Sequence, residues 1–89
     1  MSTSHNEIMY NLLEYMVKRV YMRLKELREE NHLTQQMVAD FLHIKQNTYS
    51  QYENGLRQIP IESIVMLAKY YETSTDYILE LTDVETPYP

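Results

Sequence analysis

Gly55 is the only glycine in this 89-residue chain, and the three prolines are Pro60, Pro87 and Pro89. In a helix interior, glycine costs about 1 kcal/mol and proline about 3 kcal/mol relative to alanine. The first 54 residues contain neither type, and good helix formers such as Leu, Met, Glu, Gln and Lys are frequent. These features predict an all-α fold. A chain of 89 residues is long enough for one hydrophobic core but not for two.

The spacing of the apolar residues predicts about five helices. They are expected at residues 6–31, 35–42, 46–54, 60–71 and 76–81. The first is one long helix, or two helices nearly end to end, because its apolar side chains recur every 3.6 residues. Thr34 is a favourable N-cap for the second helix, Gly55 is expected to end the third with a positive φ, and Pro60 is expected in the first turn of the fourth. Residues 82–89 are expected to be a frayed acidic tail.

Several classes of protein do not fit the sequence. The chain has no cysteine, so we expect neither disulfides nor thiolate metal sites. His5, His32 and His43 lack the spacing of a metal site, and no nucleophile has a plausible base. We therefore expect no metal, no cofactor and no enzymatic activity. The polar N-terminus has no signal-peptide pattern, and no apolar stretch approaches the roughly 20 residues of a membrane helix. These features predict a cytoplasmic protein without a membrane partner.

The net charge of −5 is unevenly distributed. Acidic and basic residues balance within residues 1–20 and again within residues 21–60, so the whole excess lies in residues 61–89. Charges further apart than about 8 Å are largely screened at physiological salt. An acidic C-terminal third therefore does not exclude a nucleic-acid-binding face elsewhere, although it predicts weak non-specific binding.

Five segments occur in a familiar order and spacing. They are residues 23–30 (RLKELREE), 33–39 (LTQQMVA), 48–55 (TYSQYENG), 64–68 (IVMLA) and 73–79 (TSTDYIL). Together they resemble the Xre/Cro-like helix-turn-helix family, which includes the lambdoid phage repressors. The resemblance covers about two thirds of the chain. It implies a lambda repressor-like all-α domain in a sequence-specific regulator of transcription, in particular a repressor, that binds double-stranded DNA as a homodimer.

The third predicted helix carries the candidate reading face. Tyr49 and Tyr52 are expected to point inward, while an outward polar set consists of Gln46, Asn47, Thr48 and Gln51. Gln and Asn side chains pair bidentately with adenine in the major groove. In the resembled repressors, the positions of this polar set read bases, and those matching Gln35 and Asn54 hold phosphates. Lys45 and Arg57 flank the helix and are expected to add phosphate contacts. The alternative is an ordinary solvated helix face.

The resemblance also implies an ion pair between Arg28 and Glu53, which would join the first helix to the end of the third. Two positions depart from the family pattern. His43 stands where the tight turn usually has glycine, and histidine tolerates positive φ better than most residues. Lys45 replaces the usual small hydroxyl residue, which removes an N-cap from the third helix.

Residues 1–22 are predicted to be a helical extension, followed by the DNA-binding domain at 23–82 and an acidic tail at 83–89. The extension carries an apolar stripe made of Met9, Leu12, Leu13, Met16, Val17 and Val20. If the helix is straight, this stripe projects beyond the domain and needs a cover. A second copy of the same helix would form a dimer, whereas the alternative is that the helix folds back on its own domain.

A different class of function remains open at this point. The helix-turn-helix scaffold, or its N-terminal helix, could serve as a protein-interaction module that binds another regulator. The acidic balance and the scarcity of lysine on the reading helix favour that alternative. The Gln-Asn-Thr-Gln set favours DNA, for which binding must weaken steeply with salt.

Overall fold

The computed structural model describes residues 4–86 and contains five α-helices and no strand in that range. The helices are α1 (His5–Glu30), α2 (Gln35–Leu42), α3 (Gln46–Glu53), α4 (Ile61–Tyr70) and α5 (Thr75–Ile78). The all-α prediction of about five helices is confirmed. Residues 1–3 of the predicted extension and 87–89 of the predicted tail lie outside the described part.

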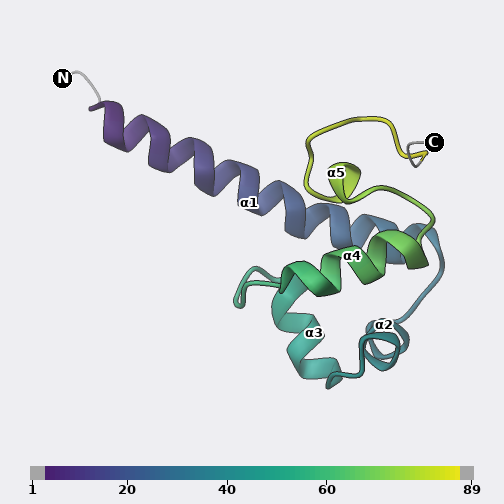
Figure 1. Cartoon of the computed structure of the whole chain (residues 1–89). Coiled ribbons are helices and arrows are strands. Elements are labelled where there is room, and N and C mark those ends of the chain that lie inside the picture. The colour runs from purple at the N-terminus through teal and green to yellow at the C-terminus, as the bar shows by residue number, and fades with distance from the viewer. Residues whose placement is uncertain (1–3, 87–89) are drawn as a thin grey trace.

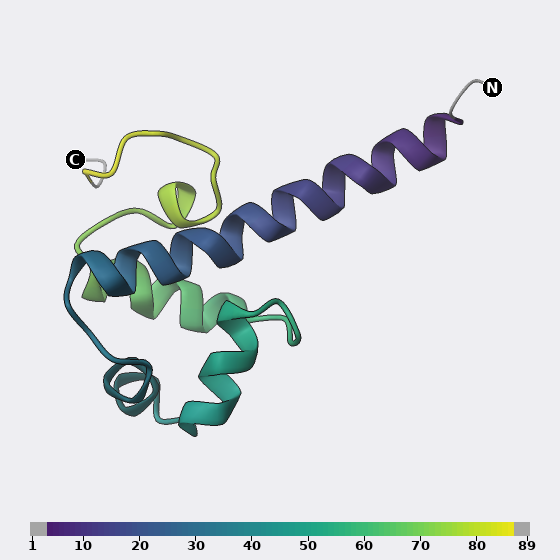
Figure 2. The same cartoon turned by 180° about the vertical axis from the view of Figure 1, so that it is seen from behind.

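The C-terminal half of α1 is the central element against which other helices of the domain pack. It packs against α3 and α5, while α2 packs against α3 and α4 against α5. In both views the N-terminal half of α1 projects away from the other helices (Figures 1 and 2). The buried core consists of Leu24, Leu27, Val38, Ala39, Leu42, Tyr49, Tyr52, Ile59, Ile64, Leu67, Ala68, Tyr71, Tyr77 and Ile78. Tyr49 and Tyr52 point inward as predicted. Within residues 4–86, no helix is both long and apolar enough to cross a membrane.

Side-chain caps begin three of the helices. Ser4, Thr34 and Ser74 each accept a hydrogen bond from the backbone N–H three residues later. Lys45 makes no such bond before α3, as predicted from its lack of a short hydroxyl side chain. The placement of Pro60 in the first turn of α4 was wrong. Its ψ of 148° is extended, and its carbonyl accepts the first hydrogen bonds of the helix, which makes it the N-cap.

All five helices end in the same backbone arrangement. One residue adopts a left-handed conformation, and it and the residue after it donate hydrogen bonds back into the last turn. The left-handed residues are His32, His43, Gly55, Glu72 and Glu80. The predicted positive φ of Gly55 is confirmed at 71°, and His43 takes the turn conformation at 59°. Four non-glycine residues therefore hold a conformation that L-amino acids disfavour.

The fifth helix is shorter than predicted, ending at Ile78 rather than at residue 81. Glu80 ends it because its φ is 62° and the Leu81 N–H bonds back to the carbonyl of Asp76. The following segment also departs from a frayed tail in its described part. The buried Thr73 donates a hydrogen bond to the carbonyl of Glu85, which ties residues 82–86 to the start of α5.

Glu80 also joins α5 to α1 through a charge cluster that the sequence analysis did not single out. The Arg23 guanidinium donates to Glu80 through Nε at 2.9 Å, and its other nitrogen Nη2 lies 2.8 Å from the same oxygen. Arg23 also donates to the Tyr77 hydroxyl. The guanidinium carbon of Arg23 lies over the Tyr77 ring, 4.0 Å from the ring centroid. Arg19 approaches the second Glu80 oxygen at 3.5 Å. The left-handed end of α5 is thus held by charge-assisted bonds to α1.

A second ion pair joins α1 to α3. Arg28 donates to Glu53 through Nε at 2.6 Å and through Nη2 at 3.1 Å, with both carboxylate oxygens engaged. Nη1 of Arg28 donates to the carbonyl of Leu33, 2.9 Å away, which fixes the connection between α1 and α2 close to the beginning of α2. The Glu53 side chain is only 2% exposed and that of Arg28 is 13% exposed. Loss of either partner would leave a largely buried charge uncompensated.

The left-handed residues at the helix ends predict two substitutions with opposite effects on the stability of the domain. Glu72 is exposed with φ 55°, so Glu72→Gly removes a Cβ penalty and should stabilise the domain by about 0.5–1 kcal/mol. Gly55→Val should destabilise it by at least about 1 kcal/mol, since a Cβ there would also lie 2.9 Å from the Tyr21 ring. Urea unfolding measures both. Glu72→Ala is the matched control, because it removes the same side chain but keeps the Cβ. An equal gain from Glu72→Ala would contradict the backbone explanation.

The buried ion pair predicts a pH-dependent loss of stability. Burial alone would raise the pKa of Glu53, but hydrogen bonds from Arg28 and Gln35 outweigh it and hold that pKa below its ordinary value. A lowered folded-state pKa stabilises the protein above the unfolded value of about 4.3, and this stabilisation is lost as pH falls through the folded-state pKa. Glu53→Gln should therefore cost about 3–5 kcal/mol at pH 7. The difference in unfolding free energy between the Glu53→Gln variant and the native chain should shrink at acidic pH.

Urea unfolding at pH 7 and at strongly acidic pH measures this change. Glu29→Gln is the matched control, because Glu29 is 57% exposed and makes only long ion pairs, 3.8 Å from Arg28 and 4.0 Å from Lys25. Exposed pairs are worth at most about 1 kcal/mol. Similar losses for the two variants at pH 7 would contradict a special role for Glu53.

Candidate nucleic-acid interface

The candidate reading face depends on how the chain turns from α2 into α3. Val38, Ala39 and Leu42 bury one side of α2, and Tyr49 buries α3 against the same core. His43 reverses the chain within two residues because its left-handed conformation lets the Ile44 N–H bond to the carbonyl of Ala39. The short turn holds α3 beside α2, with its opposite side toward solvent (Figure 1).

The four candidate base-reading residues lie on or beside this outer side of α3. Gln46 and Asn47 are exposed, while Thr48 and Gln51 are half-buried. The two tyrosines of α3 are almost completely buried, with Tyr49 at 0% and Tyr52 at 6% exposure. This alternation follows from the helical period, which turns successive residues by about 100°. The first turn of α3 is thus the most accessible part of the face.

The candidate phosphate-binding residues lie at the two ends of α3. At its beginning, Lys45 is exposed and Gln35 is half-buried in the first turn of α2. At its end, Asn54 and Arg57 are exposed, and the Asn54 amide donates to the Ser50 hydroxyl at 3.3 Å. Among the described ion pairs, neither Lys45 nor Arg57 has an acidic partner. Two cationic side chains therefore bracket the polar face of the helix.

A chain of hydrogen bonds connects this face to the buried ion pair. The Gln46 amide donates to the Gln35 carbonyl oxygen at 2.7 Å, and the Gln35 amide donates to Glu53 at 3.2 Å. Glu53 in turn accepts from Arg28. Sequence analysis placed Gln35 and Gln46 in separate sets and missed this link. No sequence signal pointed to it, because the two glutamines are 11 residues apart on different helices.

The electrostatics of the face follow from the same arrangement. The only carboxylate in α3 is that of Glu53, which is buried beneath the face and neutralised by Arg28. The exposed polar groups of α3 and its flanks are therefore amides, hydroxyls and the cations of Lys45 and Arg57, beside the apolar side chain of Leu56. Within residues 4–86, no group of three or more His, Cys, Asp or Glu side chains could hold a metal ion. This surface can form hydrogen bonds in both directions and attract anions.

Comparisons with known proteins agree with this geometry. The family described as Helix-turn-helix matches residues 24–78. The chain is 38% identical over 65 residues to the uncharacterized HTH-type transcriptional regulator YobD of Bacillus subtilis (strain 168), which covers 73% of this chain and 58% of that protein. It is 40% identical over 57 residues to the HTH-type transcriptional regulator AnsR of the same organism, covering 64% of this chain and 49% of that protein.

A phage protein is also similar. The cryptic phage CTXphi transcriptional repressor RstR of Vibrio cholerae is 37% identical over 49 residues, covering 55% of this chain and 44% of that protein. The chain thus spans about half the length of the curated relatives it matches. No solved structure matches it significantly. The matched residues include the C-terminal end of α1 and all of α2, α3, α4 and α5, so this chain belongs to the Xre/Cro-like helix-turn-helix family.

Proposed function

We propose that this chain is a sequence-specific DNA-binding regulator of transcription, acting as a repressor. The observation that carries the proposal is the polar outer face of α3, whose amide side chains lie between Lys45 and Arg57, two cations that have no acidic partner among residues 4–86. Relatives named as transcriptional regulators, and one named as a transcriptional repressor, support the same assignment. The ligand is double-stranded DNA, approached in its major groove.

The size and chemistry of α3 suit that groove. An α-helix with its side chains is about 10–12 Å across, close to the width of the B-DNA major groove of about 12 Å. Gln46, Asn47, Thr48 and Gln51 read base edges in this proposal, and Gln-adenine pairs are the contacts that their chemistry favours. The hydrogen bond from Gln46 to Gln35 holds the first reading side chain in place before binding. The Gln46 side chain therefore loses less conformational entropy when the protein binds DNA.

The flanking residues position the helix without reading sequence. Gln35 and Lys45 contact phosphates near the beginning of α3, and Asn54 and Arg57 contact phosphates near its end. Residues 23–82 form the DNA-binding domain in this proposal, with an N-terminal extension at 1–22 and an acidic tail at 83–89. The extension makes a homodimer, because a two-fold operator needs two reading helices. A regulator of this kind acts in the cytoplasm, where bacterial DNA lies.

The reading face predicts base-specific losses of affinity. After selection of bound sequences from a random DNA pool, Gln46→Ala or Gln51→Ala should each weaken binding to the selected site by about 1–3 kcal/mol and relax preference at one base pair. Titration of labelled DNA measures both effects. Asn11→Ala is the matched control, because Asn11 is an exposed amide residue on the projecting half of α1. Unchanged binding by the Gln46/Gln51 double variant would show that α3 does not dock as proposed.

The flanking cations predict a different signature. Lys45→Ala and Arg57→Ala should weaken binding to all sequences alike, and each should lower the slope of log affinity against log salt by about 1. Binding that does not depend on salt, or no binding to any member of the pool, would contradict DNA as the ligand. The protein-interaction module on the helix-turn-helix scaffold would then be the better description.

A further inference from the structure

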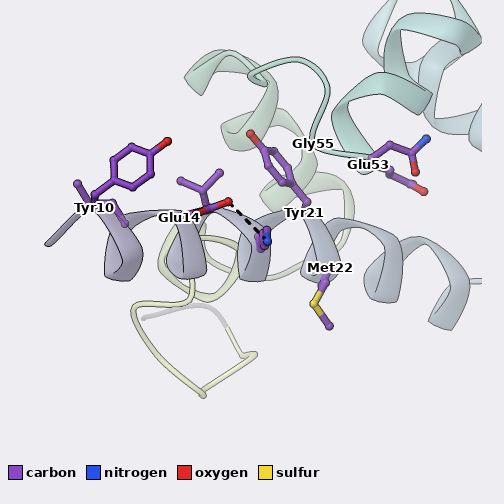
Figure 3. A pocket seen from close by; sticks show the side chains of 10 residues that line it. Tyr10, Glu14, Tyr21, Met22, Glu53 and Gly55 are labelled. Atoms are coloured by element: carbon purple, nitrogen blue, oxygen red, sulfur yellow. Dashed lines mark ion pairs between the residues drawn. The ribbon is translucent and has the colours of Figure 1, made fainter. Parts of the chain in front are cut away.

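The buried Glu53 carboxylate has an acceptor site that Arg28 and Gln35 leave unused. An ionised carboxylate accepts about four hydrogen bonds, two at each oxygen. Within residues 4–86, Oε1 accepts from Arg28 Nη2 and from the Gln35 amide, whereas Oε2 accepts only from Arg28 Nε. Glu53 lies next to Gly55 at the end of α3, beside α1 (Figure 3). Because its side chain is 2% exposed, the unused site on Oε2 is shielded from bulk water.

Two buried tyrosines have the opposite deficit. Among residues 4–86, the hydroxyls of Tyr49 and Tyr71 are the two buried side-chain polar groups without a hydrogen-bond partner. Tyr49 is completely buried and Tyr71 is 8% exposed, so both hydroxyls are enclosed by protein. A buried O–H group without an acceptor destabilises the folded state, and native proteins seldom leave one unpaired. Each of the two tyrosines therefore needs an acceptor inside the core.

Both hydroxyls lie near Glu53. Tyr49 and Glu53 are one turn apart on the buried side of α3, where side chains four residues apart are neighbours. Tyr71 approaches from the end of α4. Burial raises the pKa of both phenols, and the nearby Glu53 carboxylate raises each pKa further, so both hydroxyls keep their protons and remain donors. Burial alone would raise the pKa of Glu53, but the Tyr49 hydroxyl adds to the lowering effect of Arg28.

We propose that Tyr49 and Tyr71 are positioning residues of the reading face, because their hydroxyls complete the hydrogen bonding of Glu53. Tyr49 is the direct neighbour of Glu53, so its single proton goes to the free site on Oε2. The Tyr71 hydroxyl then donates to the oxygen of Tyr49. Both hydroxyls stop short of hydrogen-bond geometry in the structure, and a small rotation of the phenols or one interior water closes the gaps.

The consequence for DNA reading passes through Gln35. Glu53 accepts from the Gln35 amide at 3.2 Å, and the Gln35 carbonyl accepts from Gln46 at 2.7 Å. A donor on Oε2 opposes rotation of the carboxylate, and this rotation would pull Oε1 away from Gln35. The hydrogen-bond chain thus extends from α4 through α3 and α2 to the first reading side chain. This consequence rests on the proposed function, whereas the hydrogen bonds are a property of the protein alone.

Phenylalanine substitutions test the hydrogen bonds in the absence of DNA. Tyr49→Phe removes a hydroxyl and keeps the ring, so the variant should fold but unfold at a lower urea concentration than the native chain. The pKa of Glu53, followed by NMR of its carboxyl carbon, should rise because the carboxylate loses a donor. Tyr52→Phe is the matched control, since Tyr52 is buried on the same helix and its hydroxyl is not one of the two unpartnered groups. The control should leave both measurements close to their native values.

The sign of the change in stability separates paired hydroxyls from unpaired ones. If the Tyr49 hydroxyl had no acceptor, its removal would relieve an unsatisfied buried group, and Tyr49→Phe would unfold at a higher urea concentration than the native chain. Such a gain would overturn the proposal. So would an effect of Tyr49→Phe on stability or on the pKa of Glu53 that is no larger than the effect of Tyr52→Phe.

The order of the two donors is tested by combining the substitutions. Tyr71→Phe alone should lower the urea midpoint, because it removes the hydrogen bond to Tyr49. In the Tyr49→Phe background the Tyr71 hydroxyl has already lost its acceptor, so Tyr71→Phe should cause no further loss. Equal losses from Tyr71→Phe in the native and Tyr49→Phe backgrounds would show that the two hydroxyls act independently and would contradict a shared chain.

Titration of the selected DNA site measures the effect on reading. Tyr49→Phe should weaken binding several-fold and relax the same base preference as Gln46→Ala. In the Gln46→Ala background it should have little further effect, because the side chain that it positions is gone. Equal losses in both backgrounds would indicate general destabilisation and overturn the positioning role. A native chain that binds no DNA would refute the proposed function and this role in reading, while the urea measurements would still decide whether the hydrogen bonds form.

Discussion

The Glu53 carboxylate lies almost completely inside the protein at the end of α3, and the arrangement of three helices depends on its neutralisation. A buried carboxylate without a partner would cost several kcal/mol, so α1 must bring Arg28 to it and α2 must bring Gln35. These contacts reinforce the orientation of α3 relative to α1 and α2 that the packing of the shared core sets. Because Gln35 also accepts a hydrogen bond from Gln46, the same buried charge orders the first side chain of the candidate reading face.

The short connections between the helices have a backbone cost that the core must offset. Four non-glycine residues hold left-handed conformations, each of which disfavours folding by about 1 kcal/mol. These residues close the helices tightly, and the turn at His43 brings α2 and α3 close enough to share one core. Glu80 is held in its conformation by Arg23 and Arg19, so the charge cluster on α1 compensates locally for the strain at the end of α5.

The first helix connects stability to the proposed function. Its C-terminal half supplies Leu24, Leu27 and Arg28 to the domain, and its N-terminal half presents an apolar stripe to solvent. One rigid helix therefore both anchors the rest of the helical domain and extends about 20 Å beyond it. The contacts of α1 with Gly55 and Glu53 would fix the position of a partner bound to the projecting half relative to α3. In the proposed homodimer, the distance between the two DNA-binding domains would therefore depend on helix length rather than on a flexible linker.

Local patterns in the sequence determined the helical class, the approximate helix bounds and which side of α3 faces outward. They succeeded because helix propensity, capping and the 3.6-residue period act between residues that are close along the chain. The positive φ of Gly55 belongs to the same group. The family resemblance added the Arg28–Glu53 pair, which periodicity alone does not indicate. Tertiary structure decided the contacts between distant segments: Gln46 with Gln35, Arg23 with Glu80, and the Tyr21 ring against Gly55. These contacts depend on the angles at which whole helices pack, and those angles result from filling one shared core rather than from any local pattern of residues.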